Sequence, residues 1–518
     1  VVDLDGDGLP EIIFGASSGG GGHVHPGVLT ALHGKTGEEL FRVDDPNALV
    51  NSCCSLAVGD IDRDGRPEIV ANDDSSRRIL AFEHDGQLKW TSPTMIESMG
   101  DGALALADLD ADGLPEIVAG RYVLNHDGTE RWHGRGGSGG VRWGRMSIVA
   151  DITLDGTPEI LAGNTAYDHQ GNILWQVPLR DGRNAVANFD DDPFPEIVLV
   201  AGTVSLLDHT GQVKWTVNHP GGGTGGAPTV GDFNRDTLPE IGVAGASQYV
   251  VFTAQGEVLW QRPISDRSSH TTGSSLFDFN GDGTVEVVYR DERNLWVFAG
   301  EDGQVVYQRP MRSLTWKESV IGADVDRDHN AEIVAMEDYG TATGLVVIGD
   351  AKDTWVKTRP IWNQHSYHVS NINDDGTIPP FEANSWDAHN SYRCNVSPDA
   401  LACEDYSASS FRVDATKAPS ALTLLARIGN SGIVDAAVLL NVAFYEGDPQ
   451  QGGTLIGTTT TQRAVASGAY EEVSLLWNAP SYGLHELYVV VDDDGSGHGT
   501  IREADEANNT ERTTILVG

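Results

Sequence analysis

Cysteine, methionine and basic residues are all scarce in this chain of 518 residues. It has four cysteines, five methionines, and 34 lysines and arginines against 76 aspartates and glutamates, which gives a formal net charge of −42. So acidic a chain has no general basic surface for nucleic acid or anionic lipid, and divalent cations are its natural partners. No stretch approaches the ~18 consecutive apolar residues of a membrane-spanning helix, so no membrane span is predicted.

The four cysteines indicate little chemistry. Cys53 and Cys54 are adjacent, and Cys394 and Cys403 bracket a short loop that a disulfide could close. An even number is compatible with disulfides in a secreted protein, without establishing them, and no CxxC spacing points to zinc. The first residue is Val1, with no methionine or signal sequence before it, which suggests a processed or truncated N-terminus.

A motif that the chain does contain is an acidic loop, which recurs eight times. "VVDLDGDGLPEII" begins at residue 1, "GDIDRDGRPEIV" at 59, "ADLDADGLPEIV" at 107 and "FDFNGDGTVEVV" at 277. We number these acidic loops 1 to 8; their first acidic or amide residues are 3, 60, 108, 151, 188, 232, 278 and 324. A repeat of about 45 residues is typical of a propeller blade or another array of small units.

Each copy also predicts four short strands. Apolar runs precede and follow the acidic loop, and a glycine turn then leads to a strand with an aromatic four residues after the glycine. The clearest pairs are Gly86/Trp90, Gly128/Trp132, Gly171/Trp175, Gly211/Trp215 and Gly256/Trp260. The fold class is therefore all-β: an eight-bladed β-propeller, with seven blades as the alternative, in which the aromatic packs one sheet on the next.

The acidic loop has the ligand pattern of a calcium site. Side-chain oxygens fall at positions 1, 3, 5 and 9, and a glycine at position 6 permits the positive φ that folds the loop back. An oxygen-only set of six or seven ligands suits calcium rather than zinc or copper. We expect several calcium ions, one per loop, and a protein that is less stable without them.

The predicted metal ligands are, in order from loop 1 to loop 8: Asp3, Asp5, Asp7, Glu11; Asp60, Asp62, Asp64, Glu68; Asp108, Asp110, Asp112, Glu116; Asp151, Thr153, Asp155, Glu159; Asp190, Asp192, Glu196; Asp232, Asn234, Asp236, Glu240; Asp278, Asn280, Asp282, Glu286; and Asp324, Asp326, Asp328, Glu332. Loops 1, 2, 3 and 7 follow the pattern best. Loop 5 begins with Asn188 and has Pro193 at position 6, and it is the loop most expected to be empty. Loops 6 and 8 replace the glycine by Thr237 and His329.

These loops resemble the FG-GAP/VCBS repeats of integrin-α-type β-propellers over residues 1 to 358. The resemblance implies structural calcium within the blades and an extracellular or cell-surface location, and it does not identify a ligand. Most of the present loops end with glutamate after proline, where integrins commonly use aspartate.

Residues 359–413 break the repeat and are predicted to be a packed connector. The segment is rich in aromatic residues, histidine and asparagine, and a metal or sugar site around His365, His368 and Trp386 is the alternative. Within it, "NINDDGTIPPFE" places Asn371, Asn373, Asp375, Gly376 and Glu382 as in an EF-hand-like loop, which leaves a ninth calcium site open.

Residues 414–518 alternate like the strands of a β-sandwich. "RIGNSG", "VAFYEG", "LHELYVVVD" and "IREADEANNT" resemble CARDB domains, which are Ig/fibronectin-like adhesion modules. The acidic residues Asp492, Asp493, Asp494, Glu503 and Glu506 either hold another cation or form a solvated turn.

The pattern favours a secreted or cell-surface, calcium-stabilised binding or adhesion protein without catalysis. Its partner would be an extracellular protein or a polysaccharide, and a homo-oligomer is left open. The alternatives are a carbohydrate-active enzyme like the polysaccharide lyases with propeller folds, or a structural component of a filament or surface layer. Basic candidates for catalysis are scattered and form no recognisable constellation: Arg142, Arg145, His270, Lys317 and His365.

Overall fold

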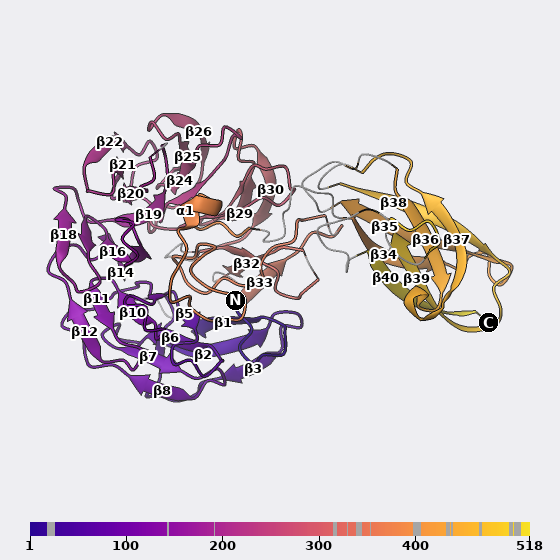
Figure 1. Cartoon of the computed structure of the whole chain (residues 1–518), viewed down its shortest axis with the longest axis horizontal. Helices are drawn as coiled ribbons and strands as arrows, with labels where there is room; N and C mark the ends of the chain where they lie inside the picture. Colours follow the sequence, from indigo (N-terminus) through magenta and orange to yellow (C-terminus); the bar gives the residue numbers. More distant parts are fainter. Residues whose placement is uncertain are drawn as a thin grey trace.

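The computed structural model describes residues 1–17, 26–141, 144–190, 192–313, 319–328, 330–337, 344–352, 354–396, 406–430, 436, 439–465, 469–496, 501 and 509–517. Strands make up nearly all of its regular structure. The exceptions in this described part are the short helix α1 (Ser385–Ala388) and a single 3-10 turn (Pro449–Gln451). Figure 1 shows a ring of small sheets beside a separate unit of two sheets. The predicted all-β class, a β-propeller followed by a β-sandwich, is confirmed.

The ring is built from small antiparallel sheets that follow one another in chain order. The strands of the first four sheets are β1 (Glu11–Ala16), β2 (Pro26–His33) and β3 (Glu39–Arg42), with β4 (Val50–Asn51) beside β2; β5 (Ala57–Gly59), β6 (Glu68–Asn72), β7 (Ile79–Phe82) and β8 (Leu88–Thr91); β9 (Ala105–Ala107), β10 (Glu116–Ala119), β11 (Tyr122–Leu124) and β12 (Glu130–His133); and β15 (Ile148–Ala150), β16 (Glu159–Ala162), β17 (Thr165–Tyr167) and β18 (Ile173–Gln176). The next four are β19 (Arg183–Ala187), β20 (Glu196–Val200), β21 (Thr203–Leu207) and β22 (Val213–Asn218); β23 (Thr229–Gly231), β24 (Glu240–Ala244), β25 (Gln248–Phe252) and β26 (Val258–Pro263); β27 (Ser275–Phe277), β28 (Glu286–Arg290), β29 (Asn294–Phe298) and β30 (Val305–Pro310); and β31 (Ile321–Ala323), β32 (Glu332–Glu337) and β33 (Gly344–Ile348). A two-stranded ribbon, β13 (Gly140–Val141) with β14 (Gly144–Arg145), lies between the third and fourth sheets in the chain.

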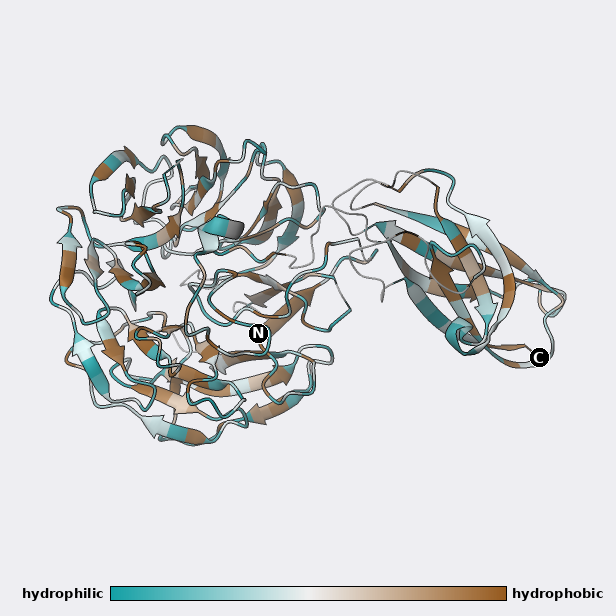
Figure 2. Cartoon of the chain, viewed as in Figure 1, coloured by the Kyte–Doolittle hydropathy of each residue, from teal (hydrophilic) through white to brown (hydrophobic). Residues whose placement is uncertain are grey.

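The middle strands of each sheet form the core of the ring. Every residue of β6, β20, β24 and β28 is buried, whereas the outermost strands β8 and β22 are half exposed. Figure 2 shows hydrophobic residues along the strands all around the ring. A strand that is covered on both faces by neighbouring sheets needs a nearly continuous apolar run, which explains sequences such as EIVAN and EIVLV.

The first strands of consecutive sheets are neighbours from β5 round to β31. This succession of sheets, each contacting the next through its first strand, is the propeller arrangement. The number of eight blades stays a prediction.

The connector crosses the ring and bonds to the first strands. The amide of Val58 donates to the Asn363 carbonyl at 2.9 Å, and the amide of Leu276 donates to the Arg393 carbonyl at 2.9 Å. Val230 and Tyr392 exchange two such bonds, of 3.1 and 2.8 Å. First strands have one edge without a partner in their own sheet, and the connector supplies hydrogen bonds for several of these edges. The segment is therefore packed on the propeller, as predicted.

The sandwich consists of two sheets. One contains β34 (Tyr406–Asp414), β35 (Ala421–Asn430) and β38 (Tyr470–Asn478); the other contains β37 (Thr454–Thr460), β36 (Asn441–Glu446), β39 (Gly483–Val491) and β40 (Thr510–Val517). The predicted start at residue 414 is wrong, because β34 begins at Tyr406. The buried side chains of Tyr406 and Ala408 belong to the sandwich core, although the intervening serines disguise the strand in the sequence.

No helix in the described part of the chain is long and apolar enough to cross a membrane. The buried Cys394 lies in the connector, while Cys403, the residue with which it brackets a short loop, lies outside the described part.

The sandwich contacts the ring through Arg427, whose Nη1 donates to the carbonyl of Ala351 at 3.0 Å.

Candidate metal centres

The eight acidic loops occupy equivalent places in the ring. In seven sheets the loop leads into the second strand, whereas loop 1 leads into β1 and only the isolated bridge of Val2 with Glu11 precedes it; in all eight the position-9 glutamate is the first residue of the strand that follows the loop. Loop 2, for example, leaves β5 after Gly59 and enters β6 at Glu68. Because the first two strands are antiparallel, all the loops lie at the same end of their sheets.

Every closing glutamate is held in the same way. Its Oε2 accepts a hydrogen bond from the backbone N–H of position 2, with N···O distances of 2.8 to 3.0 Å in all eight loops. All eight glutamates are buried. The bond fixes the carboxylate across the loop and leaves Oε1 as the atom that other groups contact.

The loop aspartates are also fixed by backbone amides. The position-5 aspartate accepts from the N–H of position 7 at 2.8 to 2.9 Å in all eight loops. The first aspartate accepts from the N–H of position 6 in loops 1, 2, 3, 4, 6 and 7, at 2.5 to 3.1 Å. These bonds preorganise the loop before any ion is present, because the carboxylates are already aimed by the backbone.

The backbone of the loop twice enters the left-handed region. Position 6 does so as predicted, at φ values from +83° to +89° in the glycines of loops 1 to 4 and 7, and at +72° in Thr237 of loop 6. Position 4 does so as well. It is glycine in loops 1 and 7 (Gly6 and Gly281), but in five other loops the sequence gives no sign of it, because the residues there are Arg63, Ala111, Leu154, Arg235 and Arg327. Non-glycine residues hold such φ values only where the surrounding structure enforces them.

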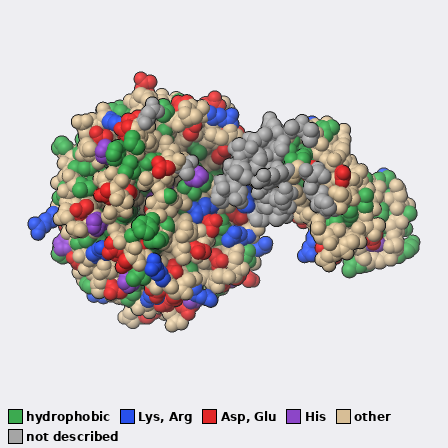
Figure 3. All heavy atoms as spheres, in the orientation of Figure 1, with side chains coloured by type: hydrophobic (Ala, Val, Ile, Leu, Met, Phe, Trp, Pro, Cys, Tyr) green, Lys and Arg blue, Asp and Glu red, His purple; other side chains and the backbone are tan. Residues whose placement is uncertain are grey.

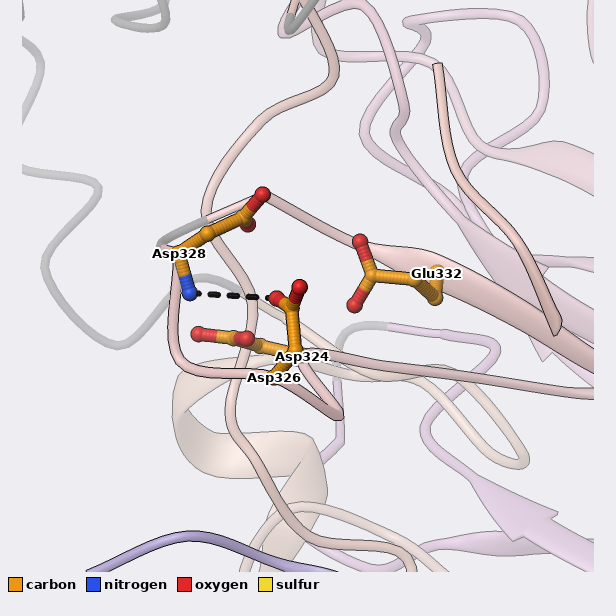
Figure 4. Close-up of side chains that lie close together, drawn as sticks. All are labelled: Asp324, Asp326, Asp328 and Glu332. Atoms are coloured by element: carbon orange, nitrogen blue, oxygen red, sulfur yellow. Dashed lines mark hydrogen bonds between the residues drawn. The ribbon is translucent and has the colours of Figure 1, made fainter. Parts of the chain in front are cut away.

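Four loops bring carboxylates together at the spacing of a cation site. In loop 8, shown in Figure 4, one oxygen from each of Asp324, Asp326, Asp328 and Glu332 lies within 4.8 Å of the others. Within the described residues, the same spacing unites Asp3, Asp5 and Glu11 in loop 1, Asp60, Asp62 and Glu68 in loop 2, and Asp108, Asp110 and Glu116 in loop 3. Oxygens bound to calcium at about 2.3 to 2.6 Å lie within such a distance of one another, so these residues fit that ion.

The remaining loops supply fewer charged groups. Position 3 is Thr153 in loop 4, Asn234 in loop 6 and Asn280 in loop 7, and both asparagine amides donate to the Oε1 of their own closing glutamates at 3.2 Å. An asparagine that turned its oxygen inward instead would offer a neutral ligand. In loop 5, Asn188 Nδ2 donates to the carbonyl of Asp192 at 2.7 Å, so the amide that should begin the ligand set is engaged within the loop.

Burial raises the free energy of the closing glutamates in their ionised form. Burial, and then repulsion from the Asp278 carboxylate, raise the pKa of Glu286 to about 8. Burial, together with repulsion from the loop aspartates, raises the pKa of Glu332 to about 9 and that of Glu68 to about 8. Without a neutralising cation, these three glutamates therefore keep their protons at neutral pH.

Several charged residues that contact the acidic loops could not be found from the acidic motif alone. Glu83 joins Asp64 and Glu68 in a further group of three carboxylates, and His33 Nδ1 lies 3.1 Å from Glu11 Oε1. Lys89, Arg131 and Lys214 form ion pairs inside loops 2, 3 and 5. Their only sequence signal is that each directly precedes the aromatic residue of its blade.

A cavity of about 110 Å³ lies between the connector and the third to fifth sheets of the propeller. Its lining includes His368, Phe381, Glu382, Trp386 and Tyr392. Glu382 accepts hydrogen bonds from His368 Nε2 and from Ser370, so it does not close an EF-hand-like set with Asp375. The acidic turn of the sandwich keeps Asp493 bonded to Tyr445, while Glu503 and Glu506 lie outside the described residues.

The basic candidates for catalysis have structural partners. Arg145 pairs with Glu97 at 2.9 Å, and the buried His365 accepts a hydrogen bond from Arg393 at its carbonyl. His270 adopts a positive φ of 62°, and Arg142 and Lys317 lie outside the described residues.

Comparison with known proteins agrees with this architecture. Residues 3–71, 60–119 and 278–335 match the family model described as FG-GAP-like repeat, and residues 401–513 match the model described as CARDB. No curated protein sequence matches the chain.

Among solved structures, the biofilm matrix protein Bap1 of V. cholerae is similar at a TM-score of 0.67 and 22% identity, over 76% of this chain and 94% of that one. The rhamnogalacturonan lyase PL11 of Bacillus licheniformis aligns at a TM-score of 0.48 and 18% identity, over 76% of this chain and 79% of that one. At these identities the likeness concerns the fold. The chain thus combines FG-GAP-like repeats, folded as a β-propeller, with a CARDB domain.

Proposed function

We propose that this chain is an extracellular, calcium-stabilised binding or adhesion protein without catalysis. The observation that carries the proposal is the repeated loop geometry: eight buried glutamates, each held by the same backbone hydrogen bond and each facing further carboxylates or amides. Burying several carboxylates together raises the free energy of the folded state, and the repetition of this cluster at every sheet is explained if a divalent cation occupies it.

The donor chemistry supports calcium. The loops offer carboxylate, amide and hydroxyl oxygens and no sulfur or imidazole at the ligand positions, which suits a hard cation of large radius. A bound calcium would neutralise the carboxylates and tie the first strand of a sheet to the second. The ligands would be those predicted at positions 1, 3, 5 and 9 of each loop.

The architecture supports binding rather than chemistry. The acidic loops hold the scaffold, so the ligand contact lies elsewhere on the ring or on the CARDB domain. Figure 3 shows acidic and basic side chains interspersed on the visible face, without one dominant basic patch. The structurally similar V. cholerae protein is named a biofilm matrix protein. An extracellular protein or a polysaccharide is the partner class that this combination favours.

A carbohydrate-active enzyme is the second candidate, and the cavity in the connector is the observation that favours it. His368 and Glu382 form a hydrogen-bonded pair at its wall, and the buried indole of Trp386 faces the same space. A histidine paired with a carboxylate is an arrangement that can serve in general acid–base catalysis.

One experiment separates these functions. The protein is incubated with a panel of acidic polysaccharides, in calcium and after calcium removal, while co-sedimentation and the absorbance of unsaturated sugars are recorded. We expect calcium-dependent binding and intact polysaccharide. Release of unsaturated sugars that is lost in Glu382→Gln would overturn the non-enzymatic assignment. Binding and a melting temperature that are both indifferent to calcium would overturn the calcium assignment.

A further inference from the structure

The outermost strand of seven sheets carries a β-bulge at one equivalent position. In the sheet of loop 2, Ala81 faces Trp90 and Phe82 faces Leu88, so Lys89 is the extra residue. The same register shift leaves one extra residue before the aromatic in each of these sheets. In chain order the seven bulge residues are Leu40, Lys89, Arg131, Leu174, Lys214, Leu259 and Val306. A bulge re-aims the side chain it carries.

In three sheets the bulge residue is basic, and it reaches the acidic loop of its own sheet. Lys89 Nζ lies 2.6 Å from Asp62 and 3.2 Å from Glu68, and it also contacts Glu83 at 2.9 Å. It therefore bridges positions 3 and 9 of loop 2, the two carboxylates that would close a metal site from opposite sides.

The other two basic bulge residues repeat this contact. Arg131 lies 2.7 Å from Asp110 and 2.6 Å from Glu116 in loop 3. Lys214 lies 2.5 Å from both Asp190 and Glu196 in loop 5. Three independent sheets thus place a cation on the same pair of loop positions, which makes an accidental surface contact a poor explanation.

In the other four sheets the bulge residue is leucine or valine. These side chains cannot neutralise a carboxylate, although the sheet places them at the same register position as Lys89. The two groups of loops therefore differ at this register position outside the acidic motif, and loops 4, 6 and 7 also lack the position-3 aspartate that the basic residue contacts in loops 2, 3 and 5. Loop 8 has no such bulge among the described strands and stands outside this comparison.

We infer that the bulge residue decides whether an acidic loop carries its own cation. Loops 2, 3 and 5 are closed by a tethered ammonium or guanidinium group, whereas loops 1, 4, 6 and 7 depend on an external ion. Calcium entering loop 2 must displace Lys89 from two carboxylates, and the tether keeps that competitor at high local concentration. The inference rests on the proposed calcium function and changes the ranking of the loops: the well-formed motifs of loops 2 and 3 bind calcium more weakly than their sequence suggests.

The test exchanges bulge residues between the two groups. Lys89→Met keeps the stem of the side chain and removes its charge, and Leu259→Lys gives loop 6 a tethered cation. Calcium binding is measured by isothermal titration calorimetry on protein first freed of calcium. We expect Lys89→Met to tighten one site about tenfold, the value of a charged hydrogen bond, and Leu259→Lys to weaken one site by a similar factor. Val258→Lys, on the neighbouring exposed position, is the matched control and should leave every site unchanged.

A second measurement uses melting temperature without calcium. Lys214→Met should melt below the wild type because loop 5 loses its internal cation, whereas Lys214→Arg should restore the wild-type value. Unchanged titrations for Lys89→Met and Leu259→Lys would overturn the inference. A wild type that binds no calcium at all would contradict the proposed function. In that case a Lys214→Met protein that melts like the wild type would overturn the tethered cation as well.

Discussion

The indole Nε1 of Trp90 donates a hydrogen bond to the carbonyl oxygen of His126, 3.0 Å away in the hairpin turn of the next sheet. The same bond joins Trp132 to His169 and Trp175 to His209. The glycine of the next turn lies beneath each ring: a Cβ added to Gly128 would be 2.5 Å from the ring of Trp90. The glycine–aromatic pairs of the sequence therefore serve two different contacts, one with the sheet before and one with the sheet after.

Replacement of a turn glycine should destabilise the ring. Gly211→Ala places a Cβ 2.7 Å from the ring of Trp175 at a residue with a φ of +83°. We expect a loss of about 2 to 4 kcal/mol, because the backbone strain of about 1 kcal/mol adds to overpacking against the indole. Gly37→Ala is the control, since it has a φ of +69° and no atom within 4 Å of the added Cβ. Urea unfolding followed by tryptophan fluorescence measures both, and equal losses would contradict the packing role.

The fold could be predicted from the sequence because the same pattern of residues recurs in every repeat. The acidic loop, the buried strand beginning at residues such as Glu68 and the glycine turn recur at the same spacing. A strand that is hard to recognise in one repeat can therefore be placed by comparison with the others. The predicted ligand positions followed from the same alternation. Among the described residues, carboxylates of loops 1, 2, 3 and 8 lie together, whereas those of loop 7, which the sequence ranked with loops 1 to 3, do not. That these residues bind a metal stays a prediction.

Contacts between distant segments could not be predicted in this way. Lys89 lies in a different strand from Glu68, and only the bulge in the strand register brings them together. The hydrogen bonds between the connector and the first strands, such as that of Val58 with Asn363, join residues some three hundred positions apart. Local periodicity carries no information about either contact.

Removal of calcium should lower the melting temperature of the propeller. Each site that is saturated at a calcium concentration of about 100 times its Kd contributes about 2.7 kcal/mol to the free energy of unfolding. Glu286→Gln should reduce the calcium-dependent part of this stability, because loop 7 loses the carboxylate that closes it. Differential scanning calorimetry with and without calcium measures both effects. Identical calcium increments in the variant and the wild type would exclude Glu286 as a ligand.

The calcium-free protein should become less stable as the pH rises. Burial, followed by repulsion from Asp278, raises the pKa of Glu286 from 4.5 to about 8 in the folded state. Between these pH values the folded state retains a proton that the unfolded state has released, so the free energy of unfolding falls with increasing pH. Thermal melts of desalted, calcium-free protein from pH 5 to pH 9 test this trend. Glu286→Gln should make the slope shallower by the share of one group, because Glu68 and Glu332 also have raised pKa values. Stability that rises through this window would contradict the buried-carboxylate account.

Thr237 occupies a backbone conformation that glycine holds in the better loops, and Thr237→Gly should therefore stabilise the protein. Its φ of +72° is unfavourable for a β-branched side chain, whereas Gly283 stands at the same position of loop 7 with a φ of +83°. We expect a gain of about 1 kcal/mol from Thr237→Gly and a similar loss from Gly283→Thr, because a Cβ at Gly283 meets its first neighbour only at 3.6 Å and strain alone would act. Chemical unfolding in saturating calcium measures the pair. A gain at Thr237 without a loss at Gly283 would show that the two loops do not share one backbone geometry in solution.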